Sequence, residues 1–137
     1  MNQFFSMSEA LNLAFHALIY LANYTDSPKK TREIAERIHV SEAHLSKVLQ
    51  TLCKAGLLKA ERGPRGGYLI ARPLKEITLF DVYKIFKHKN FTECLFPKAI
   101  CNRPEECVFR HLIKNINHLV EDTFKNITLE HLKNKIK

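Results

Sequence analysis

The sequence predicts a mainly α-helical fold with one small β-hairpin. Apolar residues recur at helical spacing over most of the chain. One turn-forming stretch, Gly-Pro-Arg-Gly-Gly at residues 63–67, separates two short apolar runs and predicts a hairpin. Only one of the four glycines lies outside that turn, so the rest of the chain has few natural breaks.

The first expected helix covers residues 8–23. Ser8 is a natural N-cap, because its hydroxyl can accept a hydrogen bond from a backbone N–H of the first turn. Leu11, Phe15 and Leu18 recur at the spacing of one helical face and predict its buried side. An Asp-Ser-Pro tripeptide then ends the helix.

Two further helices follow with a very short connection. Thr31 is expected to cap the first of them, and Ser41 the second. Leu45 and Leu52 belong to the apolar stripe of the second helix, and Gly56 is a natural stop. Two short helices in this arrangement, the second with a polar outer face, predict a helix-turn-helix.

The hairpin comes directly after these helices. Its expected strands are residues 57–62 and 68–71, with Arg62 and Arg65 near the tip. A basic hairpin attached to the second helix of a helix-turn-helix predicts a winged helix-turn-helix.

The C-terminal part is expected to be helical again. Thr78 and Asp81 have the spacing of a capping box at the start of one helix. Residues 108–124 repeat apolar side chains as in a long amphipathic helix, and Thr128 is expected to cap a final short one.

Three segments are therefore expected. A winged helix-turn-helix DNA-binding domain covers residues 1–90, a cysteine-rich loop covers residues 91–107, and a dimerisation helix with a C-terminal tail covers residues 108–137. The positive charge is concentrated in residues 29–72, where ten basic residues face four acids for a net charge of +6. Such an excess suits a polyanion such as DNA, although a merely solubilising surface is the alternative.

Other protein classes are disfavoured. The N-terminus lacks a basic stretch followed by an apolar run, and no apolar segment approaches the ~20 residues that span a bilayer. We therefore expect a cytoplasmic protein without a membrane partner, whose thiols stay reduced. No phosphate-binding glycine loop precedes a helix and no nucleophile–base motif is present, so an enzyme is not expected.

Two elements are expected to contact DNA. The second helix of a helix-turn-helix reads base edges in the major groove, and wing arginines bind phosphates or the minor groove. A winged helix used only for protein contacts, its arginines solvated, is the alternative. The predicted DNA-binding residues are Ser41, His44, Ser46, Lys47, Gln50, Arg62, Arg65 and Gly66.

Three of the four cysteines, Cys94, Cys101 and Cys107, are close together in the sequence. Thiolates are ligands of iron–sulfur clusters and of zinc. Cys53 lies near an apolar helical stripe and is expected to pack in the core, so the fourth ligand of a site would not be a nearby cysteine. A cluster with one weak ligand suits a sensor; a zinc site and metal-free thiols are the alternatives.

Residues 40–82, and above all the run RGPRGGYLIARP, resemble the winged-helix iron–sulfur transcription repressors of the IscR/NsrR type. The resemblance covers essentially the whole chain. It implies a homodimer paired through the long C-terminal helix, bound to a near-palindromic double-stranded operator, and a 2Fe–2S or 4Fe–4S cluster on the three cysteines. It also implies that Arg62 is the wing arginine that enters the minor groove and that the helix around Leu45 and Ser46 reads bases.

The resemblance implies a fourth cluster ligand of one of two kinds. One is a histidine after the third cysteine, here His111; the other comes from the first helix of the partner subunit, where Glu9, Asn12 and His16 are the candidates. The chain departs from the family pattern by one extra residue between the first two cysteines and by one extra residue between Cys107 and the histidine. Nitric oxide, redox state and iron supply are the signals to be considered.

Overall fold

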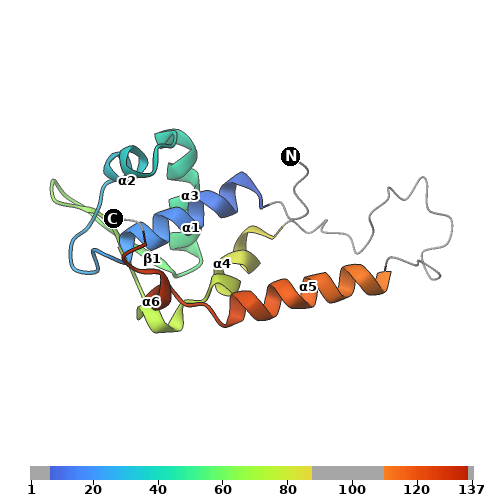
Figure 1. The fold of residues 1–137 in the computed structure, drawn as a ribbon. Helices are drawn as coiled ribbons and strands as arrows, with labels where there is room; N and C mark the ends of the chain where they lie inside the picture. Colours follow the sequence, from blue (N-terminus) through green and yellow to red (C-terminus); the bar gives the residue numbers. More distant parts are fainter. Residues whose placement is uncertain (1–6, 88–109, 136–137) are drawn as a thin grey trace.

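The computed structural model describes residues 7–87 and 110–135, and the mainly helical fold with one hairpin is confirmed (Figure 1). The predicted cysteine ligands Cys94, Cys101 and Cys107 lie outside the described residues. The elements are α1 (Glu9–Leu21), α2 (Thr31–Ile38), α3 (Glu42–Lys54), β1 (Leu58–Glu61), β2 (Gly67–Ile70), the 3-10 helix η1 (Leu74–Glu76), α4 (Leu79–Phe86), α5 (Arg110–Lys125) and α6 (Leu129–Leu132).

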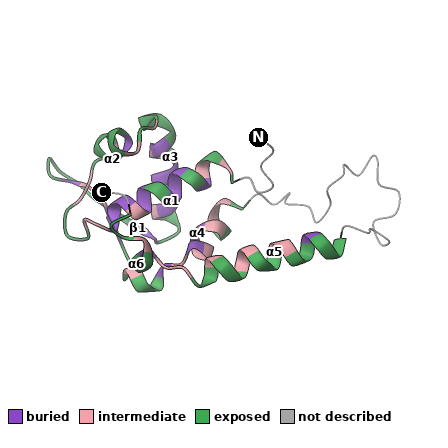
Figure 2. Ribbon diagram, in the orientation of Figure 1, coloured by how far each residue is buried: buried purple, intermediate pink, exposed green. Residues whose placement is uncertain are grey.

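Helix α1 is the centre of the core. The Ser8 hydroxyl accepts a hydrogen bond from the Leu11 N–H at 3.2 Å, so the predicted N-cap is confirmed. Leu18 and Leu21 are completely buried, and most of the helix is coloured as buried in Figure 2. A helix that is apolar on nearly all sides must be covered by its neighbours, and α1 packs against α2, α3, α4 and α6.

Helices α2 and α3 form the expected helix-turn-helix. One detail of the prediction is wrong: Lys30, not Thr31, is the N-cap of α2. The Glu33 carboxylate reaches back and accepts the Lys30 backbone N–H at 2.8 Å, so an acidic side chain caps the start and no hydroxyl is needed. In α3, Leu45 and Leu52 are fully buried, as their spacing predicts.

The hairpin is a two-stranded antiparallel sheet that starts close to the end of α3. Leu58 pairs with Ile70 at its base, and Glu61 pairs with Gly67 near its tip. Leu58 and Ile70 are buried in the main core, which fixes the base of the hairpin against the helices. The tip extends away from the core as a wing (Figure 1).

The C-terminal segment returns to the same core. The Leu79 N–H donates to the Ile127 carbonyl, and the Leu129 N–H donates to the Ile77 carbonyl, both at 2.9 Å. Leu129 is fully buried, so α6 contributes to the core that holds the helix-turn-helix. None of the described helices combines the length and the apolar character that a membrane crossing requires.

Helix α5 packs against the rest mainly through its C-terminal end. The Phe124 ring meets the rings of Phe15 and Tyr83 edge-on, each at a centroid distance of 5.7 Å. On its other side, Leu112 is 50% exposed and Leu119 is 68% exposed. The N-terminal part of the helix extends beyond α4 (Figure 1).

Candidate nucleic-acid interface

Helix α3 carries the predicted base-reading residues on the side opposite its buried leucines. Ser41, Lys47 and Gln50 are exposed, and Ser46 is half-buried. The Gln50 amide donates to the Ser46 hydroxyl at 3.4 Å, so two predicted contacts form one polar pair on the surface. These side chains could donate to and accept from base edges, as a recognition helix must.

His44 of α3 contacts α1 through Glu9. Its Nδ1 is 3.5 Å from Oε1 of Glu9, and both side chains are more than half exposed. The structure thus brings together a predicted DNA contact and a predicted cluster ligand from distant parts of the sequence. An exposed pair of this kind adds little stability. It does, however, connect α1 and α3 through their side chains.

The wing presents the two predicted arginines. Arg62 and Arg65 are exposed at the hairpin tip, whereas Gly66 is buried. A Cβ on Gly66 would lie 2.2 Å from the Glu61 carbonyl oxygen, so the tight turn excludes a side chain there. Gly66 therefore closes the tight turn directly after Arg65, where its N–H donates to the Gly63 carbonyl at 3.0 Å.

A backbone contact that no sequence pattern predicts fixes the wing from the side. Lys29 and Tyr68 form an isolated antiparallel bridge, and the Lys29 ammonium lies 4.3 Å from the centre of the Tyr24 ring. A Cβ on Gly67 would lie 2.5 Å from the Lys29 carbonyl carbon. The two adjacent glycines at residues 66 and 67 indicate that another backbone segment comes close, but they do not indicate that this segment is Lys29.

The candidate ligands on α1 share one exposed face. Glu9, Asn12 and His16 are all exposed and stand about one helical turn apart. His16 Nδ1 is 2.8 Å from the Asn12 carbonyl oxygen, which leaves its Nε2 without a partner among the described residues. A metal-binding histidine commonly donates its second ring nitrogen to such a carbonyl, so His16 has suitable chemistry for a ligand.

His111 lies in the first turn of α5 and is exposed. Within residues 7–87 and 110–135 its ring has no hydrogen-bond or ion-pair partner. The same residues contain no cluster of three His, Cys, Asp or Glu side chains that could hold a metal. Any such site therefore needs donors from outside the described part of the chain or from another subunit.

Cys53 is half-buried on α3 and packs against the core, as the sequence predicts. Burial raises the pKa of its thiol above the ordinary value. A protonated thiol is a poor nucleophile and a poor metal ligand. Cys53 is thus suited to a packing role.

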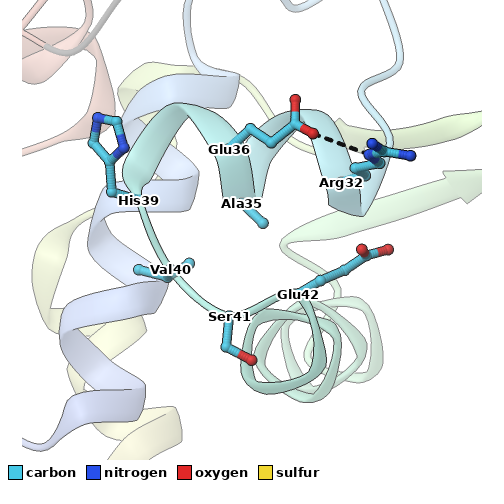
Figure 3. A pocket seen from close by; sticks show the side chains of 7 residues that line it. All are labelled: Arg32, Ala35, Glu36, His39, Val40, Ser41 and Glu42. Carbon is cyan, nitrogen blue, oxygen red and sulfur yellow. Dashed lines mark hydrogen bonds and ion pairs between the residues drawn. The ribbon is translucent and has the colours of Figure 1, made fainter.

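A surface hollow of about 480 Å³ lies between α2 and the start of α3 (Figure 3). Arg32 Nε donates to Glu36 Oε1 at 2.9 Å on one side of it, and the Glu42 side chain stands on the other. The Glu36 carboxylate, and then that of Glu42, raise the pKa of the Arg32 guanidinium. The lining residues are Arg32, Ala35, Glu36, His39, Val40, Ser41 and Glu42.

Comparison with known proteins agrees with this arrangement. The model of the Rrf2 family, described as iron-dependent transcriptional regulators, matches residues 7–135. The chain belongs to the Rrf2 family. Its winged helix-turn-helix is thus that of a DNA-binding transcriptional regulator, and an enzyme is excluded because the family consists of regulators.

Individual relatives match the chain over nearly its full length, one in sequence and two as solved structures. An HTH-type transcriptional regulator of Aquifex aeolicus is 30% identical over 130 residues, covering 93% of this chain and 90% of that protein. The solved structure of T. potens IscR has a TM-score of 0.77 at 25% identity and covers 94% of this chain and 86% of its own. CymR, the global cysteine regulator of B. subtilis, has a TM-score of 0.79 at 25% identity, covering 98% and 100%.

Proposed function

We propose that this Rrf2 regulator is a cytoplasmic repressor whose affinity for a near-palindromic operator is controlled by an iron–sulfur cluster. The observation that carries the proposal is the match of residues 7–135 to a family of iron-dependent transcriptional regulators. The three cysteines at positions 94, 101 and 107 add the donor chemistry that such a cluster uses.

Operator binding is proposed through α3 and the wing. Ser41, Ser46 and Gln50 would contact base edges, and Lys47 a phosphate. Arg62 and Arg65 would lie against the minor groove or the backbone, where the potential is negative. The exposure of the two arginines and the net charge of +6 over residues 29–72 support this assignment of the wing to DNA.

The operator's symmetry would reflect a homodimer. Leu112 and Leu119 lie one above the other on the exposed side of α5, with Ile116 between them half-buried. Large apolar side chains on one helical face are stabilised by burial against a second apolar surface. We propose that two copies of α5 pair along this face, which places two recognition helices on successive half-sites.

The cluster would be held by Cys94, Cys101 and Cys107. Among the described residues the His111 imidazole has no hydrogen-bond or ion-pair partner, and His111 follows the cysteines in sequence, so it fits as a fourth ligand from the same subunit. Glu9, Asn12 and His16 form an exposed face of α1 that would serve from the partner subunit. When bound, the cluster supplies a centre whose redox state or integrity responds to nitric oxide, oxidants or iron supply.

Regulation would follow from linkage. The cluster ligands connect to α5, and α5 packs on α1 and α4 through Phe124. If the two cluster states favour different spacings of the recognition helices, the two states bind the operator with different affinities. The cluster can then change operator occupancy only as far as this difference in affinity allows.

A second candidate is a regulator without a cluster, controlled by its thiols or by zinc. The likeness to CymR supports it, because CymR is described as a regulator of cysteine and not as an iron-dependent regulator. Three cysteines with a histidine also match the ligand set of a structural zinc site. The two candidates share the DNA-binding surface and differ only in the group that controls it.

Anaerobic purification separates these candidates. Visible absorption and the contents of iron, sulfide and zinc per chain would be measured for the wild type, for Cys101→Ala and for the control Cys53→Ala. Matching iron and sulfide, lost in Cys101→Ala and kept in Cys53→Ala, is the expected result. Operator affinity would then be compared for the loaded and the metal-free wild type, and equal affinities would contradict cluster control.

A further inference from the structure

Glu42 stands at a position where a recognition helix meets base edges. In a docked helix-turn-helix the first helix crosses the DNA backbone, and the N-terminal residues of the second contact bases. Glu42 is the first residue of α3 and is exposed. The hollow between α2 and α3 opens beside it (Figure 3).

The charges around this hollow do not suit a phosphate. Arg32 is engaged by Glu36 at 2.9 Å, whereas the Glu42 carboxylate has no hydrogen-bond or ion-pair partner within the described ranges. The hollow thus carries two carboxylates and one guanidinium, in a segment that is otherwise strongly positive. A carboxylate offers acceptors only, and a phosphate has no donor to match it.

The major groove does contain a matching donor. Cytosine presents its exocyclic N4 amine there, and a glutamate or aspartate accepts from it. We propose that Glu42 determines operator specificity by accepting a hydrogen bond from a cytosine amine in each half-site. This role rests on the proposed binding of an operator and adds a contact to the set named above.

The test uses the full-length dimer, purified without oxygen, and a pool of duplexes with a randomised central region. Wild type, Glu42→Ala, Glu42→Gln and the control Glu36→Gln would each select from the pool. We expect the wild type to enrich a C·G pair at a fixed place in each half-site, and its replacement to weaken binding about tenfold or more. Glu42→Ala should lose this preference.

The glutamine variant makes the test sharper. A glutamine side chain pairs with N6 and N7 of adenine, so Glu42→Gln should shift the preferred base at that one place toward adenine. Glu36→Gln removes one negative charge from the same hollow but lies on α2, and it should keep the wild-type consensus.

Two results would overturn the base-reading role. In the first, Glu42→Ala selects the same consensus as the wild type and binds all sequences more tightly by the same factor. That result would mean that Glu42 only repels the DNA phosphates. The other is a wild-type consensus without a fixed cytosine within reach of α3. A wild type that enriches no sequence would instead overturn the proposed operator binding itself.

Discussion

Lys29 and Tyr68 exchange two backbone hydrogen bonds, 3.1 Å from the Lys29 N–H to the Tyr68 carbonyl and 2.8 Å in the opposite direction. This bridge joins the loop after α1 to the second strand of the wing. The wing is therefore held at its side as well as at its base. Gly67 is the residue that permits this approach, because any Cβ there would overlap the Lys29 backbone.

Replacing Gly67 with Ala should separate the wing from Lys29. The added methyl group would lie too close to the Lys29 backbone, so the chain must shift. Overpacking of this kind typically lowers the free energy of unfolding by about 1–3 kcal/mol. Urea unfolding would measure the loss, and operator titration should show a larger loss of affinity than Arg65→Ala causes. The control Ala60→Gly, opposite Tyr68 in the hairpin, loosens the strand without obstructing Lys29. Equal effects of the two variants would argue against the bridge.

Replacing Arg62 with Ala should weaken operator binding and reduce its salt dependence. Each phosphate that a basic side chain neutralises adds roughly one unit to the slope of log K against log salt concentration. Titrations at several salt concentrations should therefore show a slope smaller by about one in Arg62→Ala. Arg72→Ala is a matched control, since Arg72 is exposed beyond the hairpin, next to Asp81 and Lys84. A slope that Arg62→Ala leaves unchanged would remove Arg62 from the contacts.

Much of the fold follows from periodicity and capping chemistry. Leu45 and Leu52 are buried because their spacing places them on one side of a helix, and Thr78 with Asp81 forms the predicted capping box. The burial of Leu129 could not be predicted in this way. A helix of four residues has no stripe of its own that would show where it packs.

The site was predictable in its chemistry more than in its geometry. Residue type identifies arginines and cysteines as candidate contacts and ligands, whatever their surroundings. The Glu9–His44 contact and the Lys29–Tyr68 bridge join segments distant in sequence, and no local pattern encodes such a meeting. Glu42 belongs to the exposed side of the predicted recognition helix, but the hollow that it shares with α2 depends on how the two helices pack, which no local pattern encodes.

Replacing Leu119 with Glu should convert a dimer into a monomer. Leu119 is 68% exposed in the single chain, so the substitution leaves the core intact, but two charges would face each other in a paired α5. Light scattering after size-exclusion chromatography would give the mass, and operator affinity should fall together with dimerisation. Lys114→Glu places a glutamate at an exposed position of α5 on the side away from this stripe and should stay dimeric. A dimeric Leu119→Glu variant would place the interface elsewhere.

The Asp81 carboxylate should make stability fall at acidic pH. Burial by itself raises the pKa of Asp81, but the hydrogen bonds from Thr78 and the nearby Lys84 ammonium outweigh it, so the pKa lies below the ordinary value of 3.8. The Thr78 N–H and the Asp81 N–H each donate to the other residue's side chain, at 3.0 and 3.1 Å. Because the folded chain favours the ionised form, this stabilisation is present above the ordinary pKa and is lost as pH falls through the lowered one.

Urea unfolding of the wild type and of Asp81→Asn measures this contribution. At pH 6 the variant should be less stable by about 0.5–2 kcal/mol, the usual size of a helix-cap contribution. At pH 3 and below the difference should shrink, because the wild-type carboxylate becomes protonated and loses its advantage over the amide. Glu76→Gln, which removes an exposed acid just before the helix, should show no such convergence. A difference that is the same at both pH values would mean that packing, and not the charge of Asp81, stabilises the start of α4.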